Sequence, residues 1–527
     1  MKNCFLFVVL ALVGTHAFAK PAQEKETLAR GMNGKLSHIG RYSVGSVNED
    51  GGIAEIVQYN KDNQRIYLVN GALGSLDIVD VRGLRSGSFT SLGLYRRINI
   101  SAMGDAHGFV CGDLTSAAIG VKNKVIALAV QQKDYAAPGY IVLLDYEGAY
   151  LRHYGAGVQP DMICFAGDEQ YILTADEGEP REGYGGAAID PPGSVTILNL
   201  STNEVKTVGF DAFDEAGARA ALIEKGAILG AGAKPSLDFE PEYIAVGDDN
   251  RSAWVSLQEA NAIAVLDIPE GAFSYIAALG FKDHNIPTNS LDALKDKKAE
   301  LAPQNLYGAY MPDGIAAVNI QGTTYVLTAN EGDAREWGSG DNEYADIDSF
   351  TIGKYKMDVL DNTKKDGLES GRKYLLGARS FSIWEARGPG VRQIYDSGND
   401  FETITAGFCP ENFNASHGNN DLDSRSGKKG PEPEYVAVLP VGNRFYGCVG
   451  LERIGGVMVY DISNPASPVF YDYINTRDFS ASGLAEMGDL GPEGLCAVKA
   501  TDSPTGRPLL FAANEVSGTI AVYEFGE

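Results

Sequence analysis

The sequence predicts an all-β fold, a seven-bladed β-propeller with insertions that an N-terminal strand closes. Three observations favour it: a recurring unit that pairs a polar residue with an apolar strand, many short β-branched or aromatic runs bounded by Gly, Asp and Asn, and a composition rich in turn and strand formers. The 527 residues include 63 Gly and 26 Tyr but only 3 Trp. With 44% hydrophobic residues the chain can bury a large core, which excludes a disordered chain or one small domain.

The first nineteen residues are typical of a secretory signal peptide. Lys2 gives a positive start, residues 4–13 are apolar, and Ala17-Phe18-Ala19 is a small-x-small cleavage site. The apolar run is shorter than the roughly 20 residues that a membrane span needs, which disfavours an uncleaved anchor. We therefore expect residues 1–19 to be removed and the protein to be secreted.

The rest of the chain is expected to form one domain. Residues 20–35 are a lead-in, and residues 36–527 are the propeller. Residues 36–45 alternate like a strand before the first repeat, so we expect them to pair with the last blade and cover its open edge. Two tandem β-domains or a pair of β-sandwiches are the alternatives.

Each repeat unit begins with an acidic or small polar residue, often after Pro, and reaches a second polar residue 15 to 22 positions later. The first positions are Glu55, Ser116, Asp161, Glu242, Asp313, Glu434 and Glu493. The second positions are Asn70, Gln132, Glu177, Glu259, Glu331, Glu452 and Glu515. The units that begin at Glu55 and Ser116 fit more loosely than the other five.

These units are spaced more widely than the roughly 40 to 50 residues of a bare four-stranded blade. Insertions are therefore expected near residues 205–235 and 332–378. Ala, Leu and Ile recur among charges around residues 213–226, which predicts a short peripheral helix there.

The net charge of −26 limits the classes of partner that this protein is expected to bind. It repels phosphate backbones and anionic lipid, so nucleic acid is not an expected partner, while cations or a mineral surface that presents them are. No second apolar run predicts a membrane span, and Thr519 to Glu527 lack the hydrophobic tail of a lipid-anchor signal. We expect a soluble secreted form.

Secretion also allows disulfides and N-glycans. The candidate disulfide residues, of which one must be left over, are Cys111, Cys164, Cys409, Cys448 and Cys496. The sequence leaves their connectivity open, and some could be buried hydrophobes instead. Four Asn-x-Ser sequons are candidate glycosylation sites: Asn99, Asn199, Asn250 and Asn414.

Five segments are distinctive: 173–180 (LTADEGEP), 327–336 (LTANEGDARE), 430–434 (GPEPE), 450–461 (GLERIGGVMVYD) and 513–518 (ANEVSG). They resemble the mesenchyme-specific cell surface glycoprotein family, the biomineralisation family of echinoderm skeletons and mollusc shells, which is related to bacterial choice-of-anchor I proteins. The resemblance covers roughly residues 36–525. It implies a secreted or surface-held, N-glycosylated propeller associated with calcium carbonate deposition, and it supplies no catalytic residues.

The repeat frame brings carboxylates together. Equivalent strand ends of a propeller converge near its central channel, so Glu177, Glu259, Glu331, Glu452 and Glu515 form one set there. The second set is Asp161, Glu242, Asp313, Glu434 and Glu493. Five carboxylates at one channel end repel one another unless cations or Arg side chains neutralise them, and Ca²⁺ is the cation that oxygen ligands favour. Arg181 and Arg335 are competing counter-charges, and turn capping is the alternative role of the carboxylates.

The sequence favours a non-catalytic role in a calcified extracellular matrix, with Ca²⁺ or calcium carbonate mineral as partner. It lacks Gly-x-Ser-x-Gly, the phosphate-binding Gly-x-x-x-x-Gly-Lys and His-Glu-x-x-His. Two alternatives remain. A metal-dependent, alkaline-phosphatase-like phosphoesterase would use the channel carboxylates, and a scaffold propeller would bind other matrix proteins on its faces.

Overall fold

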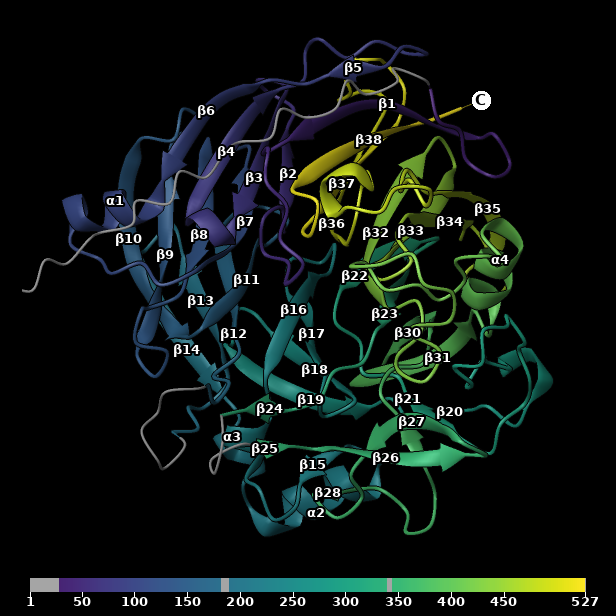
Figure 1. The fold of residues 1–527 in the computed structure, drawn as a ribbon. Coiled ribbons are helices and arrows are strands. Elements are labelled where there is room, and N and C mark those ends of the chain that lie inside the picture. Colours follow the sequence, from purple (N-terminus) through teal and green to yellow (C-terminus); the bar gives the residue numbers. More distant parts are fainter. Residues whose placement is uncertain (1–27, 182–188, 339–343, 527) are drawn as a thin grey trace, which may run out of the picture.

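The computed structural model describes residues 28–181, 189–338 and 344–526 and is nearly all β (Figure 1). The signal peptide predicted for residues 1–19 lies outside these residues. Antiparallel sheets follow one another around a central space, so the predicted all-β propeller is confirmed (Figure 1). No helix in the described part of the chain is long and apolar enough to cross a membrane.

Six sheets of the ring have four strands each, ordered as in the sequence. The first two sheets are β2 (Val57–Asn60), β3 (Arg65–Asn70), β4 (Ser75–Asp80) and β6 (Leu94–Asn99), and then β7 (Leu114–Gly120), β8 (Val125–Val130), β9 (Pro138–Leu144) and β10 (Tyr150–Val158). The third and fourth are β11 (Pro160–Phe165), β12 (Tyr171–Asp176), β13 (Ser194–Asn199) and β14 (Glu204–Gly209), and then β16 (Pro241–Val246), β17 (Ser252–Leu257), β18 (Ala262–Asp267) and β19 (Ala272–Ala278). The fifth and sixth are β22 (Ile315–Ile320), β23 (Thr323–Asn330), β30 (Ser380–Arg387) and β31 (Gly390–Asp396), and then β32 (Pro433–Val441), β33 (Arg444–Leu451), β34 (Val457–Asp461) and β35 (Val469–Ile474).

A further sheet joins the two ends of the chain. It runs in the order β36 (Pro492–Val498), β37 (Leu509–Asn514), β38 (Thr519–Phe525), β1 (Leu36–Ser43) and β5 (Thr90–Ser91). β1 pairs antiparallel with β38, from Leu36 opposite Phe525 to Ser43 opposite Thr519. The predicted closure by the N-terminal strand is therefore confirmed, although the strand ends at Ser43 and not at residue 45.

Burial explains the apolar character of the middle strands. All residues of β3 and β38 are buried, because each sheet packs against a neighbour on both faces. The outer strand β14 exposes four of its six residues, and its sequence EVKTVG is correspondingly polar. Exposure to solvent therefore rises from β3 and β38 to the outer strand β14.

Connections between sheets carry the remaining elements. The first predicted insertion holds η2 (Asp211–Phe213), α2 (Ala216–Glu224), β15 (Leu229–Gly230) and α3 (Pro235–Asp238), so the predicted helix is α2. The second holds β24 (Glu336–Trp337), β25 (Tyr344–Ala345), β26 (Ile347–Ile352), β27 (Tyr355–Leu360), β28 (Lys365–Asp366) and β29 (Tyr374–Leu375). The two insertions meet where β15 pairs with β28, in the lower part of Figure 1.

Two further connections lie outside residues 205–235 and 332–378. One between β19 and β22 contains β20 (Phe281–Asp283), η3 (Pro287–Asn289) and β21 (Tyr307–Ala309). The long segment between β31 and β32 begins with α4 (Asp400–Phe408) and continues as a loop to residue 432. The short helices α1 (Ile100–His107), η1 (Gly71–Leu73) and η5 (Leu484–Glu486) complete the fold.

The disulfide prediction is wrong for the described chain, in which all five candidate cysteines are free. The physical reason is separation: each belongs to, or packs against, a different hydrophobic cluster. The five are Cys111, Cys164, Cys409, Cys496 and Cys448. They therefore act as small apolar side chains, the alternative that the sequence left open.

The four sequons differ in accessibility. Asn99 is exposed, whereas Asn199 and Asn250 are half-buried. Asn414 is fully buried, and its Nδ2 donates to Glu402 Oε1 at 2.8 Å and Ser426 Oγ at 2.9 Å. A glycan on Asn414 is incompatible with this fold, because that nitrogen has neither a free hydrogen nor space, so the prediction is corrected there.

The closing strand supplies the first testable prediction. Ile39 of β1 is fully buried in the cluster between the closing sheet and β2–β4. Ile39→Ala should lower the free energy of unfolding by about 2–5 kcal/mol, measured by urea denaturation. Leu73→Ala, whose side chain is 48% exposed, is the control and should change it by less than about 0.5 kcal/mol. If both substitutions change the free energy of unfolding by the same small amount, a closing role for β1 is contradicted.

Candidate functional site

The antiparallel pairing of the first two strands in each sheet builds the site. Pro160 pairs with Asp176, Pro433 with Leu451, and Pro492 with Asn514, so the next residue on each strand lies at the same end of its sheet. Those next residues are Asp161 and Glu177, Glu434 and Glu452, and Glu493 and Glu515. A β-bulge follows each of these prolines, a device that re-aims a side chain.

All ten predicted carboxylates line one cavity of about 650 Å³. The cavity is lined by sixteen acidic residues, against the cationic side chains of Arg335, Lys429 and Arg453. The convergence expected from the repeat frame is therefore found in the structure.

One predicted position is out of register. Pro241 pairs with Leu257, so Gln258 and not Glu259 is equivalent to Glu177. Gln258 Nε2 donates to Glu331 Oε2 at 2.8 Å, and it therefore orients a carboxylate of the next sheet. Glu259 lies one residue further on and leaves its buried Oε2 without a partner.

The two loosely fitting units contribute less. Glu55 and Ser116 line the cavity, as does Thr115, whose Oγ1 donates to the Pro160 carbonyl oxygen at 2.9 Å. Asn70 instead caps η1 by accepting a hydrogen bond from Leu73 N, and Gln132 donates to the Tyr140 hydroxyl.

Sequence reasoning missed several lining residues: Glu179, Glu240, Asp333, His417, Lys429 and Arg453. Some of them had a signal. Glu240 belongs to a Glu-Pro-Glu segment, and Glu179 and Asp333 stand at equivalent places in Glu-Gly-Glu and Glu-Gly-Asp. His417 and Lys429 had none, because they come from the irregular loop after α4.

Carboxylates of neighbouring sheets form compact groups. In one group, ligand atoms of Asp161, Glu177 and Glu242 lie within 4.8 Å of one another, and in a second, those of Asp313, Glu331 and Glu434 do. Each group joins both strand ends of one sheet to the first strand of the next sheet. Three oxygen ligands this close are the donors that hard divalent cations prefer.

Burial and mutual repulsion raise the pKa values of these groups. Burial raises the pKa of Asp161 to about 6, and burial together with the Asp161 carboxylate raises the pKa of Glu177 to about 7. Burial and then the Glu452 carboxylate raise the pKa of Glu515 to about 8. Burial and then the Glu331 carboxylate raise the pKa of Glu434 well above its usual value. The charged state is therefore costly at this cavity without a counter-ion.

One carboxylate of the site is compensated. Glu432 accepts from Arg425 Nε at 2.8 Å and Arg453 Nε at 2.9 Å, and its Oε2 lies 3.2 Å from Lys429 Nζ. Although burial alone raises its pKa, Lys429, Arg453 and Arg425 together hold the pKa of Glu432 far below the usual value. Glu432 is an ion-pair centre, whereas Glu434, two residues away, faces other carboxylates.

The two predicted counter-charges behave differently. Arg181 Nη2 donates to Glu177 Oε2 at 3.0 Å, as expected. Arg335 does not pair with Glu331, because its Nε donates to Glu240 Oε1 at 2.8 Å. Lys429 forms the ion pair with Glu331 instead. The sequence spacing alone could not distinguish these partners.

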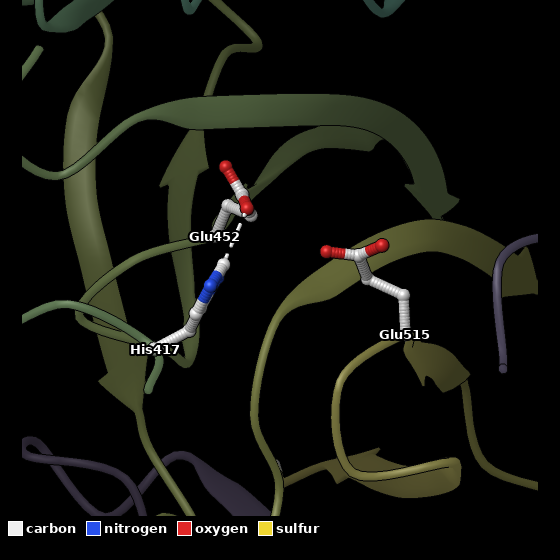
Figure 2. Close-up of side chains that lie close together, drawn as sticks. All are labelled: His417, Glu452 and Glu515. Carbon is white, nitrogen blue, oxygen red and sulfur yellow. Dashed lines mark hydrogen bonds and ion pairs between the residues drawn. The ribbon is translucent and has the colours of Figure 1, made fainter. Parts of the chain in front are cut away.

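His417 extends the site beyond carboxylates (Figure 2). Its Nδ1 lies 3.2 Å from Glu452 Oε1, and Glu515 faces the pair from the neighbouring sheet. Arg453 Nη1 is 2.7 Å from both His417 Nδ1 and Glu452 Oε1. A guanidinium therefore already occupies the cation position between these two ligands.

The carboxylate groups fit a divalent cation. Glu434 is 8% exposed, and its Oε2 has no hydrogen-bond partner. A buried, unpaired carboxylate oxygen costs free energy that coordination of a cation would remove. The residues that would hold such an ion are the grouped carboxylates; the chemistry it would supply there is charge neutralisation.

The raised pKa values predict how stability depends on pH. Groups whose folded pKa exceeds the unfolded value of about 4.5 stabilise the fold below that value and lose this contribution as pH rises through the folded pKa. In chelator, the free energy of unfolding should therefore fall between about pH 4.5 and about pH 8, the pKa of Glu515. Urea denaturation across this range should show a shallower fall for Glu515→Gln. An identical slope would contradict the assigned cause.

Two neighbouring carboxylates should respond to the same substitution with opposite sign. Glu432→Gln leaves three cations without their shared anion and should destabilise the fold by about 3–5 kcal/mol. Glu434→Gln removes a repelled charge and should stabilise it by about 1 kcal/mol or more at pH 8 in chelator. Thermal and urea unfolding measure both. Destabilisation of similar size in the two variants would contradict the electrostatic interpretation.

The chain is similar in sequence to one known protein and in structure to solved β-propellers and other chains. Over 187 residues it is 30% identical to Gigasin-3a of Magallana gigas, a match that covers 33% of this chain and 64% of that protein, just under two thirds of its length. Among solved structures, the hydrazine synthase of Kuenenia stuttgartiensis is similar at a TM-score of 0.46 and 12% identity, covering 90% of this chain and 96% of that one. The WD40 β-propeller domain of Doa1 has a TM-score of 0.43 and 6% identity over 93% and 97% of the two chains.

The sequence model of one family matches residues 55–465, most of the chain. The matched range begins at Glu55, which lines the cavity, and includes the two carboxylate groups described above. The chain belongs to the choice-of-anchor I domain family.

Proposed function

We propose that this protein is a secreted, acidic Ca²⁺-binding propeller that acts without catalysis in a calcified extracellular matrix. The observation that carries the proposal is the cavity in which sixteen acidic residues meet three Lys and Arg side chains. Such an excess of like charge in a partly buried space needs counter-ions.

Ca²⁺ is the counter-ion that this chemistry favours. It takes six to eight oxygen ligands in flexible geometry, and each ion offsets two carboxylate charges. A cavity of about 650 Å³ also leaves room for water molecules that complete the coordination shell. The whole chain has a net charge of −26, and the part of this negative charge that lies outside the cavity would attract further Ca²⁺ weakly and in a salt-dependent way.

The proposed extracellular setting rests on the sequence. Secretion rests on the composition of residues 1–19, and glycosylation rests on sequons of which Asn99 is the most accessible. The mineral role rests on the segments that resemble mesenchyme-specific cell surface glycoproteins. Membership of the choice-of-anchor I family agrees with that resemblance at a coarser level.

Calorimetric titration with CaCl₂ at roughly 150 mM salt tests the proposal on the full chain after removal of any leader. We expect one or two tight sites followed by weak surface binding, and no turnover of p-nitrophenyl phosphate in the same sample. Glu411→Gln, at an exposed carboxylate outside the cavity, is the control and should retain the tight sites.

The other outcomes would point elsewhere. Turnover that a chelator abolishes would replace the proposal with a metal-dependent phosphoesterase. If the titration gives no heat and the sample shows no turnover, Ca²⁺ binding is contradicted. That result would favour a propeller that binds matrix proteins on its faces. Weak sites alone would restrict Ca²⁺ to the surface.

A further inference from the structure

We infer that the group of Asp313, Glu331 and Glu434 is the first Ca²⁺ site of the cavity, and that Lys429 is a built-in competitor that the ion must displace. The inference rests on the proposed function and adds which carboxylates bind first and what sets their affinity. It follows from three comparisons within the cavity.

The first comparison concerns unsatisfied ligands. Of the three members, Glu331 and Glu434 are buried, and Glu434, which lines the cavity, has a buried oxygen without a hydrogen-bond partner. In the related group, Asp161, Glu177 and Glu242 are all half-buried, and no oxygen of theirs is both buried and unpartnered within the described chain. The group around Glu434 therefore gains more when a cation arrives.

The second comparison concerns the resident counter-charges. Arg181, beside Glu177, is held by three partners: it donates to Glu177 and Gln159 and lies 3.0 Å from Glu179 Oε2. A planar guanidinium fixed in this way is hard to remove. Lys429 is a point charge on a flexible stem, and it is easier to move.

More than one carboxylate lies close to the Lys429 ammonium. Its Nζ lies 2.5 Å from Glu331 Oε1, 3.2 Å from Glu432 Oε2 and 3.6 Å from Asp333 Oδ1. A cation that binds Glu331 can repel the ammonium towards the other two carboxylates without leaving it unpaired. Gln258 meanwhile holds the second oxygen of Glu331 in place.

The third comparison excludes the other groups. The group of Glu331, Glu432 and Glu452 is compensated by Lys429, Arg425 and Arg453. The group around His417 already has a guanidinium between two of its ligands. A first ion at either place would have to displace an arginine.

Calorimetric titration of the full chain with CaCl₂ tests the inference. Glu434→Gln should weaken the tightest site at least about a hundredfold, more than the loss typical of residues behind the ligands. Lys429→Met should strengthen the same site by about tenfold, because one competing positive charge is gone. Lys429→Arg keeps the charge and should stay close to or below the wild-type affinity.

Separate controls distinguish the possible failures. Thermal unfolding in chelator should show that Glu434→Gln is folded and at least as stable as the wild type. Loss of the tightest site in Glu242→Gln, equal to or greater than the loss in Glu434→Gln, would overturn the site assignment while Ca²⁺ binding by the cavity stands. Weaker binding in Lys429→Met would overturn the competitor role. No binding by the wild type would instead refute the proposed function itself.

Discussion

Closing a ring of antiparallel sheets forces equivalent strand ends into one place, and the site depends on this constraint. The first strand of each sheet starts where the second strand ends, so one repeat contributes two side chains to the same cavity. Pairing of β1 with β38 completes the ring from the two ends of the chain. A repeat that places acidic residues at both positions therefore concentrates negative charge at the centre, whatever the surrounding loops do.

Such a concentration opposes folding unless it is neutralised, and the connections between sheets supply part of the answer. Lys429 and Arg425 belong to the loop after α4, and Arg335 follows β23; their partners belong to the repeat frame or lie beside it. The irregular segments therefore do more than link blades. They place cations at selected carboxylates and leave others uncompensated.

The contrast between Glu432 and Glu434 shows how local this selection is. The two residues flank Pro433, and β32 begins at that proline. Glu432 faces three cations, whereas Glu434 turns into the cavity towards Asp313 and Glu331. Proline lacks a backbone N–H and a bulge follows it, so the chain can direct the side chains on either side of Pro433 to opposite environments. A single sequence motif thus holds one carboxylate that is compensated by cations and one that is not.

The sequence by itself determined the β-propeller class, the closing strand and the ten carboxylates, because periodic strands and repeated polar positions are local signals. Only the tertiary structure decided the rest. Register showed that Gln258 replaces Glu259 as the equivalent residue, burial removed Asn414 from the sequons, and separation of the clusters left five cysteines unpaired. His417 and Lys429 carry no repeat signal; they reach the cavity because a long loop folds back over it, and the contacts that result join residues far apart in the chain.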